Sequence, residues 1–234
     1  MKPILFLICH GIQYSETSDY FFAPIASGIR RFLPSNHKVV FRSINWAKYV
    51  ENWQNELFLA LKKNHRWFVW WVVRIICFLI SDTWLFLLCR KNNDKSDLEQ
   101  KIYNDVKYEV SYFLNNYPDG LVVFGGHSWG SEIMLKMCYE DFPVYGLITW
   151  GNVTSYMSGA YEDGGRIPPV KFWTILHHRG DPVSTDMLEN KNFKDFVKVI
   201  DVTDWRNFLF AHTSYWKSKK VHKEIANILI DISK

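Results

Sequence analysis

The chain has 234 residues and a formal net charge of +4, and its Lys and Arg residues form no dense basic arm. This charge is too small to indicate a nucleic-acid partner, and the length suits a single α/β domain with a sizeable core. The four cysteines form no C-x-x-C pair and have no metal-like spacing to histidine. This usage indicates a reduced compartment, so we expect a cytoplasmic location and no metal site.

Strands and helices alternate in the first part of the chain. The apolar stretch Ile4–Cys9 is shorter than the core of a secretion signal and has no cleavage site after it, so we predict a core strand there. A helix over Phe21–Phe32, a strand over Lys38–Arg42 and a helix over Trp46–Leu61 are predicted next.

Residues 67–89, WFVWWVVRIICFLISDTWLFLLC, contain much of the aromatic excess of a chain with 11 Trp residues. Their length suits a membrane span of about 20 residues. Arg74 and Asp82 argue against a span, because each costs roughly 2.5–3.5 kcal/mol at the middle of a bilayer. The strands before and after this stretch must also join one sheet, which excludes a single crossing.

Three arrangements of this segment therefore stay open: a membrane hairpin, an interfacial helix and a buried cap. Its Trp residues and the basic residues at its ends suit the headgroup level of a membrane. We expect residues 64–95 to be an insertion in one domain that spans 1–234, with 67–89 contacting a membrane surface.

The second part of the chain continues the alternation. The predicted elements are a helix over Leu98–Asn115, a strand over Leu121–Phe124, a helix over Ser131–Tyr139, strands over Val144–Trp150, Phe172–His177 and Phe196–Val202, and a helix over Ser218–Ile232. An irregular Gly-rich loop is expected around Ser158–Arg166. Strands that alternate with helices indicate a parallel sheet in a doubly wound α/β fold.

Residues 122–133, VVFGGHSWGSEI, place a serine between an apolar run and a stretch with helical spacing. A chain that passes from strand to helix within about three residues must bend sharply, and the neighbours of the bend must be small. Gly126 and Gly130 flank Ser128 in the G-x-S-x-G pattern of a nucleophile elbow. We predict Ser128 as a catalytic nucleophile.

A serine nucleophile needs a base that is held by an acid, and after such an elbow the acid comes before the histidine. Asp181 follows the strand Phe172–His177 in HHRGDPVS, at the edge where catalytic groups gather. It is the predicted acid, with Asp186 and Asp204 in reserve.

His212, in FAHTSYW, lies between the last strand and the last helix and is the predicted base. We expect His127 to point away from the nucleophile, and His177 and His178 to support the site or to pack in the core. His37, His65 and His222 are expected at the surface.

Backbone N–H groups that are fixed before the reaction can stabilise the oxyanion. One should come from Trp129, directly after the nucleophile. The second should come from Ile12, in the loop after the first strand, where Gly11 permits a close approach of the backbone.

Together, ILFLICHG, GHSWGS, HHRGDPVS and AHTSYW resemble the α/β-hydrolase superfamily of the serine esterase and lipase type, in the family order from residue 4 to residue 216. The resemblance implies acyl transfer through an acyl-enzyme, with no metal or organic cofactor, and an inserted lid over the strand ends. Two departures are visible. The two strands that usually precede the oxyanion strand are not expected, which leaves a minimal parallel sheet of about six strands flanked by helices. Ser131-Glu132 also replaces two small residues after the elbow.

The sequence thus favours a serine hydrolase that cleaves lipid-like or long acyl esters at a membrane surface. A thioesterase or an acyltransferase would use the same three residues. A membrane-associated interaction protein on a hydrolase fold is the non-enzymatic alternative, and the intact set of three residues argues against it. The head group, the acyl length and the oligomeric state stay open.

Overall fold

The computed structural model describes residues 1–11, 19–49, 97–153, 166–181, 184, 193, 195–204 and 211–234. Ile12, the insertion predicted at 64–95, most of the predicted helix over Trp46–Leu61 and nearly all of the Gly-rich loop lie outside these residues. Within the described parts of the chain, no helix is both long and apolar enough to span a bilayer.

Six parallel strands form one sheet in the order β2-β1-β3-β4-β5-β6. They are β1 (Ile4–Cys9), β2 (Val39–Ile44), β3 (Leu121–His127), β4 (Val144–Trp150), β5 (Phe172–His177) and β6 (Val197–Asp201). The register pairs the last residue of β1, Cys9, with Gly126, and the last residue of β3, His127, with Trp150. The carboxyl ends of neighbouring strands therefore meet at one edge of the sheet.

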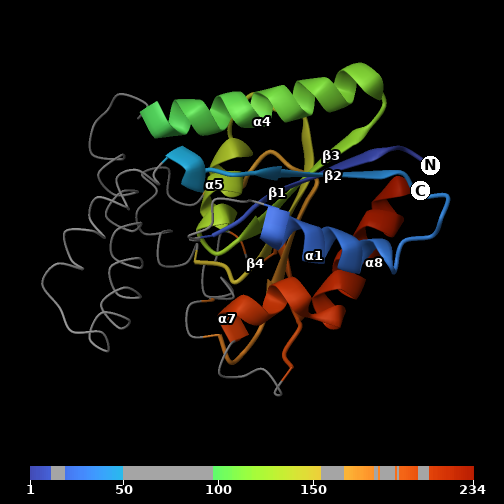
Figure 1. Ribbon diagram of the computed structural model, residues 1–234, viewed down its shortest axis with the longest axis vertical. Coiled ribbons are helices and arrows are strands. Elements are labelled where there is room, and N and C mark those ends of the chain that lie inside the picture. Colours follow the sequence, from blue (N-terminus) through green and yellow to red (C-terminus); the bar gives the residue numbers. More distant parts are fainter. Residues whose placement is uncertain are drawn as a thin grey trace, which may run out of the picture.

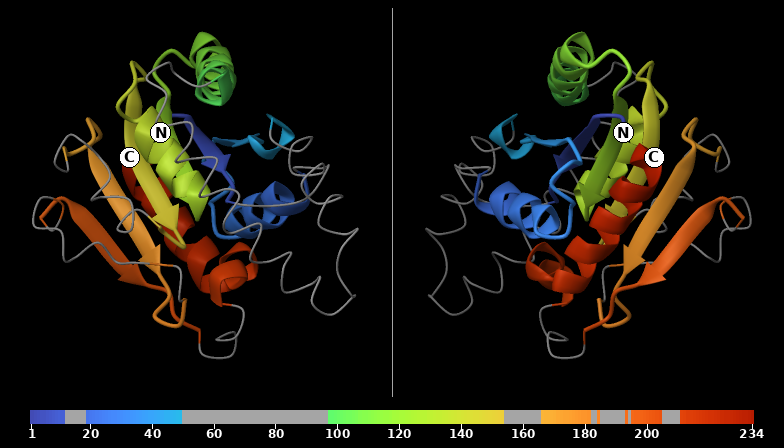
Figure 2. Two further views of the ribbon diagram at one scale, coloured as in Figure 1. Left: turned by 90° about the vertical axis from the view of Figure 1, so that its left-hand side faces the viewer. Right: turned by 90° about the vertical axis from the view of Figure 1, so that its right-hand side faces the viewer.

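Helices cover both faces of the sheet (Figures 1 and 2). The helices α4 (Asp97–Asn116) and α5 (Trp129–Met137) pack on one face, while α1 (Asp19–Arg30) and α8 (Lys219–Ser233) pack on the other. Along β1, Leu5 and Leu7 point into the first layer, and Phe6 and Ile8 point into the second. Burial on both faces explains why the strand is apolar at every position.

The two chain ends meet at the edge of the sheet opposite the carboxyl ends of the strands. Figure 2 shows the N-terminus beside the end of α8, and the Lys2 N–H donates to the Ser233 carbonyl at 3.2 Å. The last helix thereby closes against the first strand.

The predicted parallel sheet with helices on both faces is confirmed. Three strands have the predicted bounds, whereas the boundaries around the elbow differ. The strand β3 continues to His127, three residues beyond the prediction, and α5 begins at Trp129, two residues before it. The described start of the helix predicted over Trp46–Leu61 is a single 3₁₀ turn, η1 (Ala47–Tyr49).

Candidate active site

Ser128 forms the whole bend between β3 and α5. Its φ is 54° and its ψ is −125°, and among the described residues it alone has a positive φ without being glycine. Residues with a side chain rarely adopt this backbone conformation. It typically costs about 1–3 kcal/mol and persists only where the surrounding structure imposes it. The Ser128 N–H donates to the Trp150 carbonyl at 3.1 Å, which ties the bend to the neighbouring strand.

The two flanking glycines are sterically required. A Cβ at Gly126 would lie 2.5 Å from the Ser131 Cα, and a Cβ at Gly130 would lie 2.2 Å from the Cys9 carbonyl oxygen. Both contacts are with backbone, which cannot move aside as a side chain can. The small residues expected around the elbow thus allow α5 to turn back against β3 and the end of β1.

Gly11 lies against the serine. A Cβ at this position would come within 2.5 Å of the Ser128 Cβ and 3.1 Å of the Ser128 Oγ. The loop after β1 therefore runs beside the hydroxyl, where the sequence predicts the oxyanion donors. Trp129 begins α5 next to it, and Ile12 lies outside the described residues.

The loop after β1 is held by side chains from the end of β2. The His10 Nδ1–H donates to the Gly11 carbonyl at 2.6 Å, and His10 Nε2 lies 3.2 Å from the Asn45 side-chain amide. The Trp46 indole N–H donates to the His10 carbonyl at 2.8 Å, and its ring stacks on the His10 ring. Burial lowers the pKa of His10. This support was not foreseen from the sequence.

Asp181 and His212 are paired, although they come from different parts of the chain. The His212 Nδ1 lies 2.9 Å and 3.1 Å from the two carboxylate oxygens of Asp181. The Asp181 side chain is fully buried, while that of His212 is 25% exposed. A buried carboxylate at this position orients the ring and stabilises the imidazolium form. His212 lies on the short helix α7 (Ala211–Ser214).

The turn that carries Asp181 is held by buried groups. The Gly180 N–H donates to His178 Nδ1 at 3.0 Å, and His178 Nε2 lies 3.1 Å from the Asp204 backbone nitrogen and 3.2 Å from the Asp204 carbonyl oxygen. The His178 N–H donates to the Tyr215 hydroxyl at 3.0 Å. Burial, followed by the nearby charge of Asp181, raises the pKa of Tyr215. His178 therefore supports the site, one of the two roles expected for it, and Asp204 contributes its backbone to the same turn.

Two expectations about histidines are wrong. His127 does not point away from the site: its ring lies 4.9 Å from the His212 ring, and its Nε2–H donates to the His212 carbonyl at 2.8 Å. His222 is not a surface residue, because it is buried and its Nε2–H donates to the Trp216 carbonyl at 2.9 Å.

Burial controls the charge of His127. It lowers the pKa of this ring to about 3, with the neighbouring His212 as the second cause. Because His127 stays neutral at ordinary pH, His212 has no second imidazolium beside it. Among the described residues, no group of three His, Cys, Asp or Glu side chains is arranged to hold a metal ion.

The carboxyl edge of the sheet thus gathers a strained serine between strand and helix, a glycine after β1, and a carboxylate–histidine pair carried after β5 and β6. These groups follow the chain order serine, acid, histidine on six parallel strands. The chain has an α/β-hydrolase fold.

Comparison with known proteins gives no match to a protein-family model and none to a curated protein. Several solved structures are similar to this chain over most of its length. A cutinase-like protein from Cryptococcus sp. is 12% identical with a TM-score of 0.49, over 97% of this chain and 93% of that chain. An esterase domain from a Rhodothermus marinus protein is 11% identical with a TM-score of 0.49, over 96% and 84%. An α/β serine hydrolase homologue from Coxiella burnetii is 12% identical with a TM-score of 0.48, over 99% and 85%.

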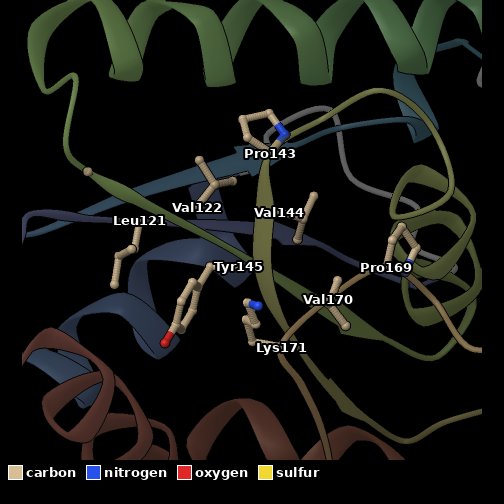
Figure 3. A pocket seen from close by; sticks show the side chains of 9 residues that line it. Leu121, Val122, Pro143, Val144, Tyr145, Pro169, Val170 and Lys171 are labelled. Atoms are coloured by element: carbon tan, nitrogen blue, oxygen red, sulfur yellow. The ribbon is translucent and has the colours of Figure 1, made fainter.

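A surface cavity of about 280 Å³ lies at the opposite edge of the sheet (Figure 3). It is formed at the amino ends of β3 and β4 and just before β5, where Tyr145 and Lys171 are its polar side chains. Ligands of parallel α/β sheets bind outside the carboxyl ends of the strands. This cavity is therefore separate from the candidate active site.

Proposed function

We propose that the protein is a serine hydrolase that cleaves carboxylic esters through an acyl-enzyme on Ser128. The observation that carries this proposal is the backbone of Ser128, with its φ of 54° between a strand and a helix. A non-glycine residue is seldom held in this conformation, and such strain clusters at active sites. The Asp181–His212 pair at the same edge supplies the base that a serine nucleophile needs.

In the first step the Ser128 oxygen attacks the ester carbonyl carbon while His212 Nε2 takes the hydroxyl proton. Asp181 accepts the Nδ1–H bond of His212 and stabilises the imidazolium that forms. The negative charge on the carbonyl oxygen is stabilised by the N–H groups of Trp129 and Ile12. Collapse of the tetrahedral intermediate breaks the ester bond, and the leaving alcohol takes the proton from His212.

Hydrolysis of the acyl-enzyme repeats these steps with water. His212 removes a proton from the water molecule as its oxygen attacks the acyl carbon. Collapse of the second tetrahedral intermediate breaks the bond to Ser128 and releases the carboxylic acid, and His212 returns its proton to the Ser128 oxygen. Neither step requires a metal or an organic cofactor.

For the substrate we propose lipid-like or long acyl esters at the cytoplasmic face of a membrane. The support comes from the sequence of residues 67–89, whose Trp and Phe side chains suit a lipid interface. In this proposal the segment serves as a lid that selects the acyl chain.

Hydrolysis of p-nitrophenyl esters from acetate to palmitate tests this function. Ser128→Ala should lower kcat by about 10⁴–10⁶-fold, and Asp181→Asn by about 10³–10⁴-fold. Asp204→Asn is the matched control, because Asp204 follows the neighbouring strand β6 and is the acid that the sequence held in reserve. An Asp204→Asn variant as slow as Asp181→Asn would refute the assignment of the acid.

The same series decides between reaction classes. A matched thioester that turns over faster than the ester would indicate a thioesterase, and ester products formed with an added alcohol would indicate an acyltransferase. A folded protein that turns over none of these substrates would refute the proposed function.

A further inference from the structure

His127 ends β3 directly before Ser128 and lies in a box of aromatic rings. Its ring centroid is 4.9 Å from that of His212, 5.0 Å from that of Trp216 and 5.8 Å from that of Tyr215. The residue is only 5% exposed. Its side chain is therefore closely confined, with His212 as one of its walls.

One polar contact connects this box to the base. The His127 Nε2–H donates to the backbone carbonyl of His212 at 2.8 Å. The helix α7 that carries His212 has only four residues. So short a helix is stabilised mainly by contacts from outside itself, because most of its carbonyls have no partner within the helix. The bond from His127 is such a contact.

Gly151 makes room for the two rings side by side. Its φ is 56°, and a Cβ there would lie 3.0 Å from His127 Nε2 and 3.1 Å from His212 Cε1. The preceding residue, Trp150, accepts the N–H of Ser128 through its carbonyl. The last residue of β4 and Gly151 directly after it thus border the elbow, His127 and His212 together.

We propose that His127 is a positioning residue, which ties the helix that carries the base to the strand that carries the nucleophile. The inference rests on the proposed function, in which His212 is the base. The Asp181 carboxylate fixes the orientation of the His212 ring, whereas the hydrogen bond from His127 fixes the position of the His212 backbone relative to the elbow. A misplacement of about 1 Å can cost about 100-fold in rate, so this second anchor matters for catalysis.

Two substitutions separate the hydrogen bond from packing. His127→Leu fills much of the space without a donor, and His127→Gln keeps an N–H near the position of Nε2. His222→Leu is the matched control for His127→Leu, because it removes the donor of a buried histidine whose Nε2–H also donates to a backbone carbonyl, that of Trp216. Rates are measured at a temperature where urea unfolding shows every variant to be folded.

We expect His127→Leu to lower kcat about 10–100-fold with KM changed less than about threefold, because the base is displaced and substrate contacts are not. His127→Gln should recover most of the lost kcat. His222→Leu should lose stability and keep its kcat. The downfield proton resonance of the His212 Nδ1–H bond to Asp181 should broaden or vanish in His127→Leu and persist in the other two variants.

A His127→Leu variant with unchanged kcat, or a His127→Gln variant as slow as His127→Leu, would overturn the inference. A loss of kcat in His222→Leu equal to that in His127→Leu would do the same, since the loss of any buried histidine would then explain both. A wild-type protein without hydrolase activity refutes the proposed function instead. The proton resonance then decides by itself whether His127 holds His212 against Asp181.

Discussion

Replacing the strained serine by glycine should stabilise the protein relative to replacement by alanine. Ser128→Ala and Ser128→Gly both remove the hydroxyl, and they differ only in the Cβ. In the wild-type conformation, φ 54° and ψ −125°, a Cβ is strained and glycine is not. The difference in stability between the two variants therefore includes the strain at this one residue.

The expected difference is the balance of three contributions. Relief of the strain is worth about 1–3 kcal/mol. Against it stand about 0.5–1 kcal/mol for the greater freedom of glycine in the unfolded chain and up to about 0.8 kcal/mol for one buried carbon group. Ser128→Gly should thus exceed Ser128→Ala by about 1 kcal/mol in free energy of unfolding. For a chain of this length, that is about 2–4 °C in melting temperature.

A matched pair gives the ordinary cost of the same change. Ser27 lies inside α1 and is exposed. There, Ser27→Gly should be less stable than Ser27→Ala by about 1 kcal/mol, the usual cost of glycine in a helix. Urea unfolding of all four variants measures both differences. If glycine destabilises equally at both positions, the elbow stores no strain, and the main observation behind the proposed function loses its force.

Three further predictions concern pH, packing and lipid. Because the folded protein lowers the pKa of His127 from 6.5 to about 3, the unfolded chain alone binds this proton between those values. Stability should be lost as the pH falls through that range, by at most about 5 kcal/mol from this ring. The urea midpoint should therefore fall less steeply with pH in His127→Leu than in the wild-type protein. Equal slopes of urea midpoint against pH would contradict the reasoning. Gly130→Ala places a Cβ 2.2 Å from the Cys9 carbonyl oxygen, so we expect a loss of about 3 kcal/mol in urea unfolding together with a loss of ester hydrolysis. Gly120→Ala, whose Cβ would meet the Phe113 ring and the Tyr117 carbonyl oxygen at the opposite edge of the sheet, should lose stability and keep its activity. If residues 67–89 insert into lipid, vesicle binding should survive high salt. A variant that combines Trp70→Ser, Trp71→Ser and Phe78→Ser should no longer bind vesicles, and it should lose activity on long esters but not on short ones. A variant that still binds vesicles would refute the contact.

The strands were predictable because the apolar runs that mark them in the sequence are the residues that the sheet buries on both faces. Ile4–Cys9, Val144–Trp150 and Phe172–His177 have the predicted bounds. Each is a short, largely apolar run, and a parallel sheet covered on both faces requires such runs. The same logic placed Asp181 and His212 at the edge where the structure pairs them.

The elbow boundaries were missed because local preference and tertiary structure disagree there. Gly125 and Gly126 are poor strand formers, and Gly130 is a poor helix former. The sequence pattern therefore predicts a shorter strand before Ser128 and a shorter helix after it. In the structure, β1 and β4 pair with β3 on both sides and extend it to His127. The bend is thereby confined to Ser128 alone.

The buried histidines could not be recognised from the sequence. The space for His222 is created by Gly28, in a helix far away in the chain, where a Cβ would lie 2.1 Å from the imidazole ring. The partner of His127 is a backbone carbonyl, which carries no sequence signal. Ile12 as an oxyanion donor and the membrane contact of residues 67–89 stay predictions, because both lie outside the described residues.

Labelling with a fluorophosphonate probe tests most directly whether Ser128 is the nucleophile. We expect one probe per molecule by intact mass, located by peptide mapping at Ser128, absent from Ser128→Ala and unchanged in Ser27→Ala. Asp181→Asn should label far more slowly, because His212 then lacks the partner that orients it. A folded protein that takes up no probe, or takes it up at another residue with Ser128→Ala unaffected, would contradict the account.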